Sequence, residues 1–178
     1  MEFKLDGARV QIHKRGDAIR IYSRRLSDVT DGLPDVVDLA LSGIRPEEAV
    51  LDGEVVAIDG EGRPLPFQTL MERFKRVHDV GRMIERIPLK LFLFDAIFVN
   101  GESLIDRPYE RRREILEECC GRDLVVERAI ASGAAEVELF LKRAMEEGHE
   151  GIVAKSLHGP YSPGTRSKDW LKIKPSRT

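Results

Sequence analysis

The chain has 178 residues, which suits one domain with a real hydrophobic core. Its 29 basic and 31 acidic residues give a net charge of -2, which excludes a uniformly basic nucleic-acid-binding protein, although local basic clusters can still bind phosphate. The two cysteines are adjacent, at Cys119 and Cys120, so neither a structural disulfide nor a zinc site is expected. No apolar run reaches membrane-spanning length and the charged N-terminus is unlike a signal peptide, so we expect a cytoplasmic protein, intracellular or associated with the nucleoid.

In the first half of the chain, the residue pattern predicts a hairpin, two helices and a strand. Apolar and polar residues alternate on both sides of a glycine-containing turn, which predicts a β-hairpin over residues 9–24. Pro34 opens an apolar-periodic segment that is typical of a helix. Residues 49–58 predict a strand, and the residues from Pro66 to Phe74 have apolar side chains spaced for one helical face.

The second half mixes strands and helices without a regular βαβ order, which favours one α+β domain over residues 1–178. Expected strands cover residues 89–99, 124–129, 150–156 and 169–174, and expected helices cover residues 109–120 and 134–147. The last helix is expected to bury a broad apolar face made of Val137, Leu139, Phe140, Leu141 and Met145.

Five short polar signals fall on strand ends or on the turns beside them. They are Lys4-Leu5-Asp6-Gly7-Ala8-Arg9, Leu51-Asp52-Gly53-Glu54, Leu93-Phe94-Asp95, Glu150-Gly151-Ile152-Val153-Ala154-Lys155 and Trp170-Leu171-Lys172-Ile173-Lys174. Charged groups inside apolar strands are costly to bury unless something pairs with them. A nucleotide polyphosphate with a divalent metal would pair with all of them.

In their order and spacing, these signals resemble the motifs of the covalent nucleotidyltransferases, which are DNA ligases, RNA ligases and mRNA-capping enzymes. Tyr22-Ser23-Arg24-Arg25 and Pro66-Phe67-Gln68 resemble the ATP-dependent DNA ligases of the archaeal and eukaryotic replicative type. The resemblance covers residues 2–175. It implies the α+β covalent nucleotidyltransferase (ATP-grasp-like) fold, with two antiparallel β-sheets flanked by helices and ATP between them.

Lys4 resembles the lysine that attacks the α-phosphate of ATP to form lysyl-AMP. A lysine ammonium is protonated at neutral pH, so nearby cations such as Lys172, Lys174 and a metal would favour its neutral, nucleophilic form. The alternative is a solvated surface lysine. Glu2 resembles the position that contacts the adenine edge, and its alternative is an exposed terminal glutamate. Because Glu2 follows Met1 and Lys4 lies only three residues from the chain end, we expect fraying there to make the position of Lys4 the least secure part of the site.

The remaining nucleotide contacts implied by the resemblance come from residues beyond the first strand. Arg9 and Arg24 resemble the arginines that hold the ribose and phosphates, for which a guanidinium fork is well suited. Phe94 resembles the aromatic residue that stacks on the purine, with an ordinary core phenylalanine as the alternative. Lys172 and Lys174 are two apart, so a strand points both to one face, where they would bind the triphosphate and stabilise the leaving pyrophosphate.

Metal and DNA contacts are also implied. Glu54 resembles the carboxylate that contacts the ribose or the metal, and Glu150 resembles the carboxylate beside the metal, so both are candidate Mg²⁺ ligands. The alternative for each is a strand-end glutamate paired with a basic neighbour. Asp6 and Asp52 are interpreted as turn-forming residues. Lys155 is a candidate phosphate contact. Two groups of basic residues would either follow a DNA backbone or form a solvated face. One group lies in segment 73–90, and the other lies near the C-terminus and consists of Arg166, Lys168 and Arg177.

The resemblance implies the adenylation domain of an ATP-dependent DNA ligase, with ATP, Mg²⁺ and nicked double-stranded DNA as its ligands and with roles in DNA repair, replication and recombination. In the family, an N-terminal DNA-binding domain and a C-terminal oligonucleotide-binding-fold domain accompany this region. We expect this chain to lack both and to have weak activity alone. The alternatives are an RNA ligase or capping guanylyltransferase domain, or a non-catalytic nucleotide- or DNA-binding module with the same fold.

Overall fold

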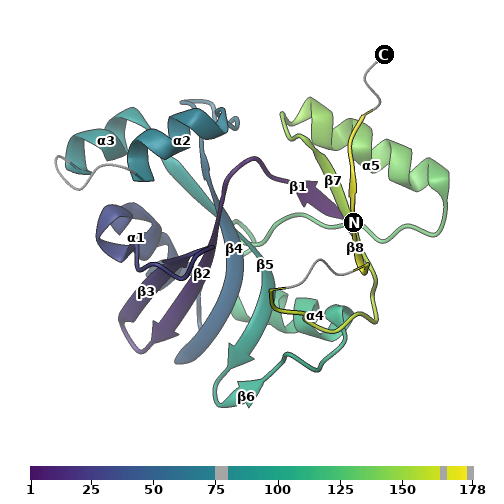
Figure 1. Cartoon of the computed structure of the whole chain (residues 1–178), viewed down its shortest axis with the longest axis horizontal. Coiled ribbons are helices and arrows are strands. Elements are labelled where there is room, and N and C mark those ends of the chain that lie inside the picture. Colours follow the sequence, from purple (N-terminus) through teal and green to yellow (C-terminus); the bar gives the residue numbers. More distant parts are fainter. Residues whose placement is uncertain (75–79, 165–167, 176–178) are drawn as a thin grey trace.

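The computed structural model describes residues 1–74, 80–164 and 168–175, which form two antiparallel β-sheets with helices packed around them (Figure 1). The larger sheet has the order β3-β2-β4-β5-β6 and the smaller sheet the order β1-β7-β8. The strands are β1 (Glu2–Lys4), β2 (Ala8–Arg15), β3 (Ala18–Ser23), β4 (Glu48–Ala57), β5 (Leu89–Val99), β6 (Glu102–Ser103), β7 (Gly151–Lys155) and β8 (Trp170–Ile173). The helices are the short η1 (Thr30–Gly32), α1 (Pro34–Gly43), α2 (Phe67–Phe74), α3 (Val80–Arg86), α4 (Tyr109–Cys119) and α5 (Ala134–Glu146).

Strand β4 lies at the centre of the larger sheet and carries polar residues into its middle. It pairs with β2 so that Glu54 lies opposite Arg9. On its other side, its pairing with β5 shifts register on both sides of Leu51-Asp52. Such irregularities re-aim side chains next to functional sites. The apolar residues of β2, β4 and β5 form the main core with α1, and burial of this apolar surface is the largest stabilising contribution.

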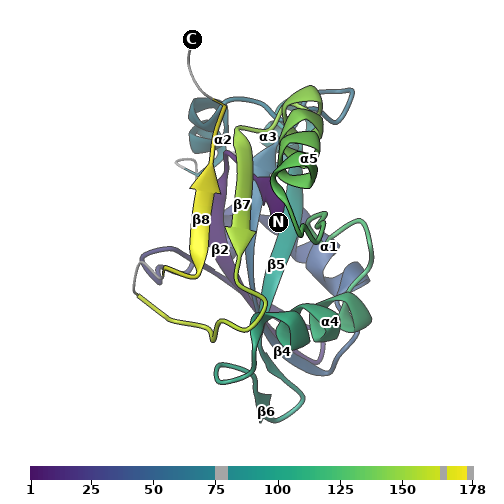
Figure 2. The same cartoon turned by 90° about the vertical axis from the view of Figure 1, so that its right-hand side faces the viewer.

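The smaller sheet packs against α5, as Figure 2 shows for β7. Phe3 of β1 stacks on Phe140 of α5 with ring centroids 4.9 Å apart. The second core joins the two sheets, because Phe94 of β5 lies edge-on to Trp170 of β8 with ring centroids 6.1 Å apart. Strand β1 leads directly into β2, so the chain crosses from one sheet to the other within residues 5–7 (Figure 1).

Most expected elements are confirmed, including the hairpin, the two antiparallel sheets and the helices that begin at Pro34 and Tyr109. The strand expected over residues 124–129 is wrong, because there Val125 and Arg128 form only isolated bridges. The broad apolar face expected for α5 is also wrong in part, since Leu139 is 71% exposed. That helix covers only the three-stranded sheet, so a narrower stripe of its side chains is buried.

Several charged residues have other roles than expected. Arg73 belongs to the basic segment expected either to follow DNA or to form a solvated face, but it does neither, because it is buried and its Nη2 lies 2.6 Å from Asp35 Oδ1. Lys75, Arg76 and His78 of that segment lie outside the described residues. Asp52 is not a turn residue, because it is buried in the middle of β4. Among the described helices, none has the length and apolar character required to cross a membrane.

Candidate functional site

A cavity of about 680 Å³ lies between the two sheets, and we call it the front cavity. Side chains reach it from β1, β7 and β8 of the smaller sheet and from β2, β4 and β5 of the larger one. Predicted site residues that line it are Glu2, Lys4, Arg9, Arg24, Glu54, Phe94, Lys155 and Lys172. Residues from all five sequence signals therefore line or border one cavity.

Lys4 is held at the end of β1 by an ion pair with Glu150, whose other oxygen accepts a hydrogen bond from Lys174 Nζ at 2.8 Å. These two lysines lower the pKa of the Glu150 carboxyl, because hydrogen bonds from Lys174 and Lys4 favour its charged form. Neither Lys174 nor Glu150 lines the front cavity, and both are connected to it through Lys4, with which Glu150 pairs.

The fraying expected near Lys4 is not observed. Strand β1 pairs with β7, with Lys4 opposite Gly151. The Met1 amino group donates a hydrogen bond to the Ala129 carbonyl at 2.6 Å, and the Ala129 N–H donates to the Met1 carbonyl at 2.9 Å. The backbone of this N-terminal segment is thus paired with β7 on one edge and with Ala129 on the other, and these pairings hold Lys4 in place.

Glu54 extends from β4 toward the turn that follows Lys4. Its Oε1 accepts a hydrogen bond from the Gly7 N–H at 2.9 Å. A side chain at Gly7 would collide with the Val55 carbonyl, so this close approach requires glycine. Burial raises the pKa of Glu54, and the Gly7 N–H and the charges of Lys4 and Arg9 offset only part of that effect.

Arg9 is already paired with side chains of the protein. Its Nη2 lies 2.6 Å from Asp52 Oδ2, and the Tyr161 hydroxyl donates to the same oxygen at 2.6 Å. The Arg9 guanidinium also lies 5.7 Å from the centre of the Phe94 ring. Asp52 and Tyr161 were missed as members of the site, although a carboxylate in an apolar strand already called for a cationic partner.

Phe94 is mostly buried between the two sheets, and the next residue along β5, Asp95, is buried completely. Asp95 accepts two hydrogen bonds from Arg112 of α4, at 2.8 and 3.0 Å. This two-point ion pair fixes β5 against α4. Arg112 and its neighbour Arg113 were missed because a run of charges on a helix usually marks a solvated face.

Glu2 is buried rather than exposed at the chain end. Its carboxylate contacts Arg113, Tyr109 and Lys155, and Lys155 is buried with it rather than free at the surface. Lys172 lines the front cavity from β8 and is exposed. Arg24 follows β3, and it is exposed at the cavity wall. Lys168 is exposed and is not in the lining, whereas Arg166 and Arg177 lie outside the described residues.

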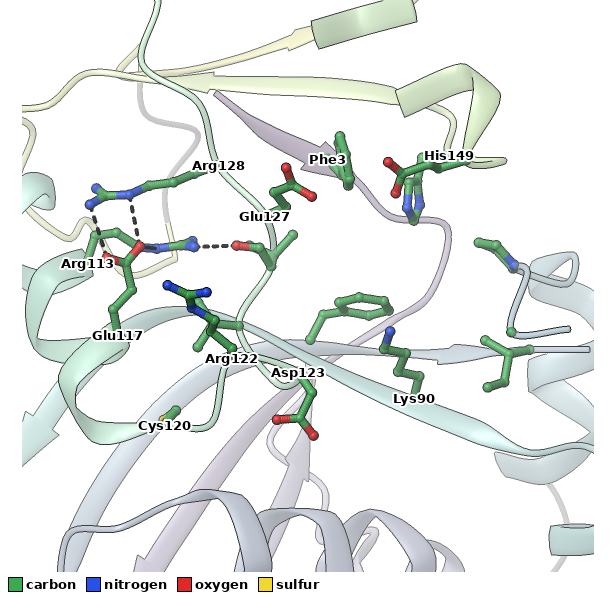
Figure 3. A pocket seen from close by; sticks show the side chains of 17 residues that line it. Phe3, Lys90, Arg113, Glu117, Cys120, Arg122, Asp123, Glu127, Arg128 and His149 are labelled. Atoms are coloured by element: carbon green, nitrogen blue, oxygen red, sulfur yellow. Dashed lines mark hydrogen bonds and ion pairs between the residues drawn. The ribbon is translucent and has the colours of Figure 1, made fainter. Parts of the chain in front are cut away.

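A second cavity of about 800 Å³, the back cavity, is lined in part by Phe3 of β1, which also lines the front cavity (Figure 3). Its walls include Lys90 of β5 and His149, whose side chains point into the cavity from opposite sides (Figure 3). Glu117 is paired there with Arg113 and Arg128, each at 3.0 Å. This larger cavity is lined by none of the predicted nucleotide-binding residues that the structure describes.

The two carboxylates nearest Lys4 are suited to a divalent cation. Among the described residues, no group of three or more histidine, cysteine and acidic side chains could hold a metal by itself. Mg²⁺ commonly takes one or two carboxylates and completes its shell with water and substrate phosphates. Glu54 and Glu150 are carboxylates of that kind, and Glu54 Oε1 is already oriented by Gly7.

Known proteins resemble nearly the whole chain. The family described as "ATP dependent DNA ligase domain" matches residues 1–174. The DNA ligase of Thermococcus fumicolans is 49% identical over 178 residues, which covers 98% of this chain and 32% of that protein. DNA ligase 1 of Korarchaeum cryptofilum is 50% identical over 175 residues, with the same two shares. The chain thus spans about a third of the length of these relatives.

Solved structures agree with this assignment. A mycobacterial DNA ligase D complexed with ATP and MES has a TM-score of 0.74 and 26% sequence identity, covering 97% of this chain and 53% of that one. The Chlorella virus DNA ligase-adenylate, at 17% identity, shares the fold, with a TM-score of 0.67 over 97% of this chain and 61% of that one. Both resemblances cover 97% of this chain and therefore include both of its sheets. The chain belongs to the family of ATP-dependent DNA ligase domains.

Proposed function

We propose that this chain is the adenylation domain of an ATP-dependent DNA ligase and that Lys4 is its nucleophile. The observation that supports this most is the position of Lys4, which borders the front cavity beside Glu54 and is oriented by Glu150. A lysine held in this way can attack without losing further side-chain freedom, because its geometry is fixed before the nucleotide binds.

In the proposed first step, Lys4 Nζ releases a proton to water by way of Glu150 and attacks the α-phosphorus of ATP, and a second proton leaves the nitrogen to water as the adduct forms. A phosphorus–nitrogen bond forms, and the bond to the bridging oxygen breaks, so the electron pair of that bond leaves with pyrophosphate. Lys172 and Lys174 would stabilise the charge that develops on this leaving group. Lys174 already bonds the carboxylate that holds Lys4, so one arriving phosphate oxygen could contact both lysines.

The other residues would hold the nucleotide around this reaction. Phe94 would stack on the purine, while Arg9 and Arg24 would contact the ribose and phosphates. Glu54 and Glu150 would hold Mg²⁺, which when bound neutralises phosphate charge. Glu2 would face the adenine edge. The similar mycobacterial DNA ligase D is complexed with ATP, which supports ATP as the substrate here.

The later steps require DNA. The lysine-bound AMP would pass to a DNA 5′-phosphate, and a 3′-hydroxyl would then displace AMP and seal the nick. Lys168 and Arg166 are the candidate contacts to the DNA backbone. Because the relatives are about three times as long, we propose that flanking DNA-binding and oligonucleotide-binding-fold domains complete the site and that this chain alone seals nicks weakly. ATP and nicked DNA are intracellular, so the proposed activity belongs to the cytoplasm, at the nucleoid, in replication, repair and recombination.

The test is covalent labelling. The protein is incubated with Mg²⁺ and either α-labelled ATP or α-labelled GTP, and acid-labile label on the protein is measured. We expect label from ATP that is lost in Lys4→Ala and retained in the control variant Lys142→Ala, whose lysine is exposed on α5. Label from GTP only would replace the proposal with a guanylyltransferase. ATP binding by calorimetry without label would favour a non-catalytic module.

A further inference from the structure

The Glu2 carboxylate has an unusual number of partners for a residue that faces a ligand cavity. Its Oε1 accepts hydrogen bonds from the Tyr109 hydroxyl and from Arg113 Nη1, the latter at 2.8 Å. Its Oε2 lies 2.5 Å from Lys155 Nζ. An ionised carboxylate has about four acceptor positions, so these three partners leave about one, on Oε2.

Lys155 cannot leave this position easily. Its side chain is only 3% exposed, and its ammonium lies over three aromatic rings. The distances from Nζ to the ring centres are 4.8 Å for Phe94, 5.1 Å for Tyr109 and 4.1 Å for Trp170. Aromatic faces attract a desolvated cation, so the rings keep the ammonium beside Glu2 rather than at the phosphate end of the cavity.

The surroundings also determine the charge of Glu2. Burial alone raises the pKa of this carboxyl, but the charges of Lys155 and Arg113 and the hydrogen bond from Tyr109 outweigh it and hold the pKa below its usual range. At neutral pH, Glu2 is therefore ionised and can only accept hydrogen bonds. A partner that offers a lone pair instead of an N–H would be repelled.

We propose that Lys155 and Arg113 are positioning residues that hold Glu2 as an acceptor-only group and thereby select a 6-amino purine nucleotide over a 6-oxo one. This inference rests on the proposed function, because it assigns the Glu2 end of the front cavity to the purine edge. The 6-amino group of adenine would donate to the remaining position on Oε2. The 6-oxo group of inosine or guanine would place an oxygen against a carboxylate that has no proton to offer.

The test compares ATP with inosine triphosphate, which differ at position 6 of the purine. Both nucleotides, labelled at the α-phosphate, are given to the full chain with Mg²⁺, and the initial rate of adduct formation is measured against concentration. Lys155→Met removes the charge and keeps a long apolar side chain in the aromatic cage. We expect it to lower the ATP-to-inosine-triphosphate preference about 10-fold or more, mainly through weaker ATP binding.

A pH profile separates positioning from a structural effect. With its nearest cation removed in Lys155→Met, the pKa of Glu2 rises, so the ATP preference should be lost at a higher pH on acidification than in the parent protein. Glu2→Gln should also lower the preference for ATP, and it should abolish the loss of that preference on acidification, because glutamine does not titrate. In the double variant, Lys155→Met should add little further loss, because both changes act on one contact.

Two further variants keep the inference falsifiable. Tyr109→Phe retains the aromatic ring and removes one hydrogen bond to Glu2, so it should shift the preference in the same direction by a smaller factor. Lys142→Met, on the exposed face of α5, should leave the preference and the pH profile unchanged. A Lys155→Met protein that loses activity with both nucleotides in equal proportion would overturn the inference, as would an unchanged preference in folded Lys155→Met and Tyr109→Phe.

Failure of the proposed function would look different. If the parent protein forms no adduct, the nucleophile assignment fails, and calorimetric binding of the two nucleotides to the same variants then decides the inference. A binding preference for ATP that falls in Lys155→Met would support the positioning role without catalysis. A preference that is absent from the parent or unchanged in the variant would overturn it.

Discussion

The front and back cavities meet neighbouring residues of one short strand, yet they differ in chemistry. Lys4 of β1 borders the front cavity, while the side chain of Phe3 stacks on His149 at the back cavity with ring centroids 4.8 Å apart. The back cavity is the larger, at about 800 Å³ against about 680 Å³. The two cavities therefore differ less in size than in the side chains that line them.

The ion pairs around the two cavities differ in how deeply their charged side chains are buried. At the front cavity, the Lys155–Glu2 pair is at most 4% exposed, and Arg113, which lines the back cavity, is buried against the same carboxylate. At the back cavity, Glu127 pairs with Arg143 while both side chains are about half exposed, at 42% and 50%. Burying charge is expensive, and the chain does so on the side where the predicted nucleotide-binding residues gather.

The largest expected effect comes from the buried pair behind the front cavity. Arg112→Met leaves the Asp95 carboxylate buried without its two-point partner, which costs about 3–5 kcal/mol of folding stability. Arg143→Met, which removes exposed pairs beside the back cavity, should leave the denaturation midpoint nearly unchanged. Chemical denaturation of both variants checks this. Equal losses would mean that the two cavities do not differ in the burial of their charges.

The next largest effect is expected on the rate of lysine adenylation, and it should differ between the adjacent residues Glu150 and His149. Glu150→Gln replaces the carboxylate that holds Lys4 and Lys174, so lysine adenylation should slow about 10²-fold because Nζ is no longer oriented. His149→Phe keeps an aromatic ring against Phe3 at the back cavity, and its adenylation rate should match that of the parent. Rates of label incorporation at saturating ATP measure both. A His149→Phe defect as large as that of Glu150→Gln would assign the back cavity a part in the reaction.

His149 should make folding stability depend on pH. Burial lowers its pKa from the usual 6.5, so the unfolded chain takes up a proton at a higher pH than the folded chain does. Stability therefore falls as the pH drops below about 6.5, by at most about 1.4 kcal/mol per pH unit for this one group. In His149→Phe, this contribution should disappear. Denaturation midpoints at several pH values between neutrality and the folded pKa measure the difference, and identical slopes in the two proteins would contradict the prediction.

The smallest effect is expected at the wall of the back cavity. Lys90 Nζ lies 4.9 Å from the centre of the Phe92 ring. Lys90→Ala should cost about 0.5–1 kcal/mol of stability through loss of this contact and leave ATP labelling unchanged. Lys172→Ala, in the front cavity, provides the matched comparison and should weaken labelling. Thermal melts and labelling of both proteins check the pair. A labelling defect in Lys90→Ala would show that the back cavity serves the nucleotide.

Much of this molecule follows from local pattern. The hairpin, the apolar strand β5 and the helices after Pro34 and Pro108 are visible as periodicity and turn residues, because each depends on neighbours in sequence. The charged residues that interrupt the strands, such as Lys4 and Glu54, are visible for the same reason, since an apolar strand makes them stand out. Their order and spacing resemble the motifs of a known family, and it was this resemblance that implied the two-sheet fold.

The partners of these residues were decided only by the tertiary structure. Glu2 was predicted at the adenine edge, with an exposed terminal glutamate as the alternative, and Arg113 lies in a run of charges on a helix, but the two meet across 111 positions of sequence. Pairing at that separation depends on how β1, β7 and α4 pack, which no local period encodes. The sequence determined which groups are candidates for the chemistry. Only the fold determined that Lys4 is secured by Glu150 and that Lys155 is held inside an aromatic cage, because burial and contact are properties of the packed chain.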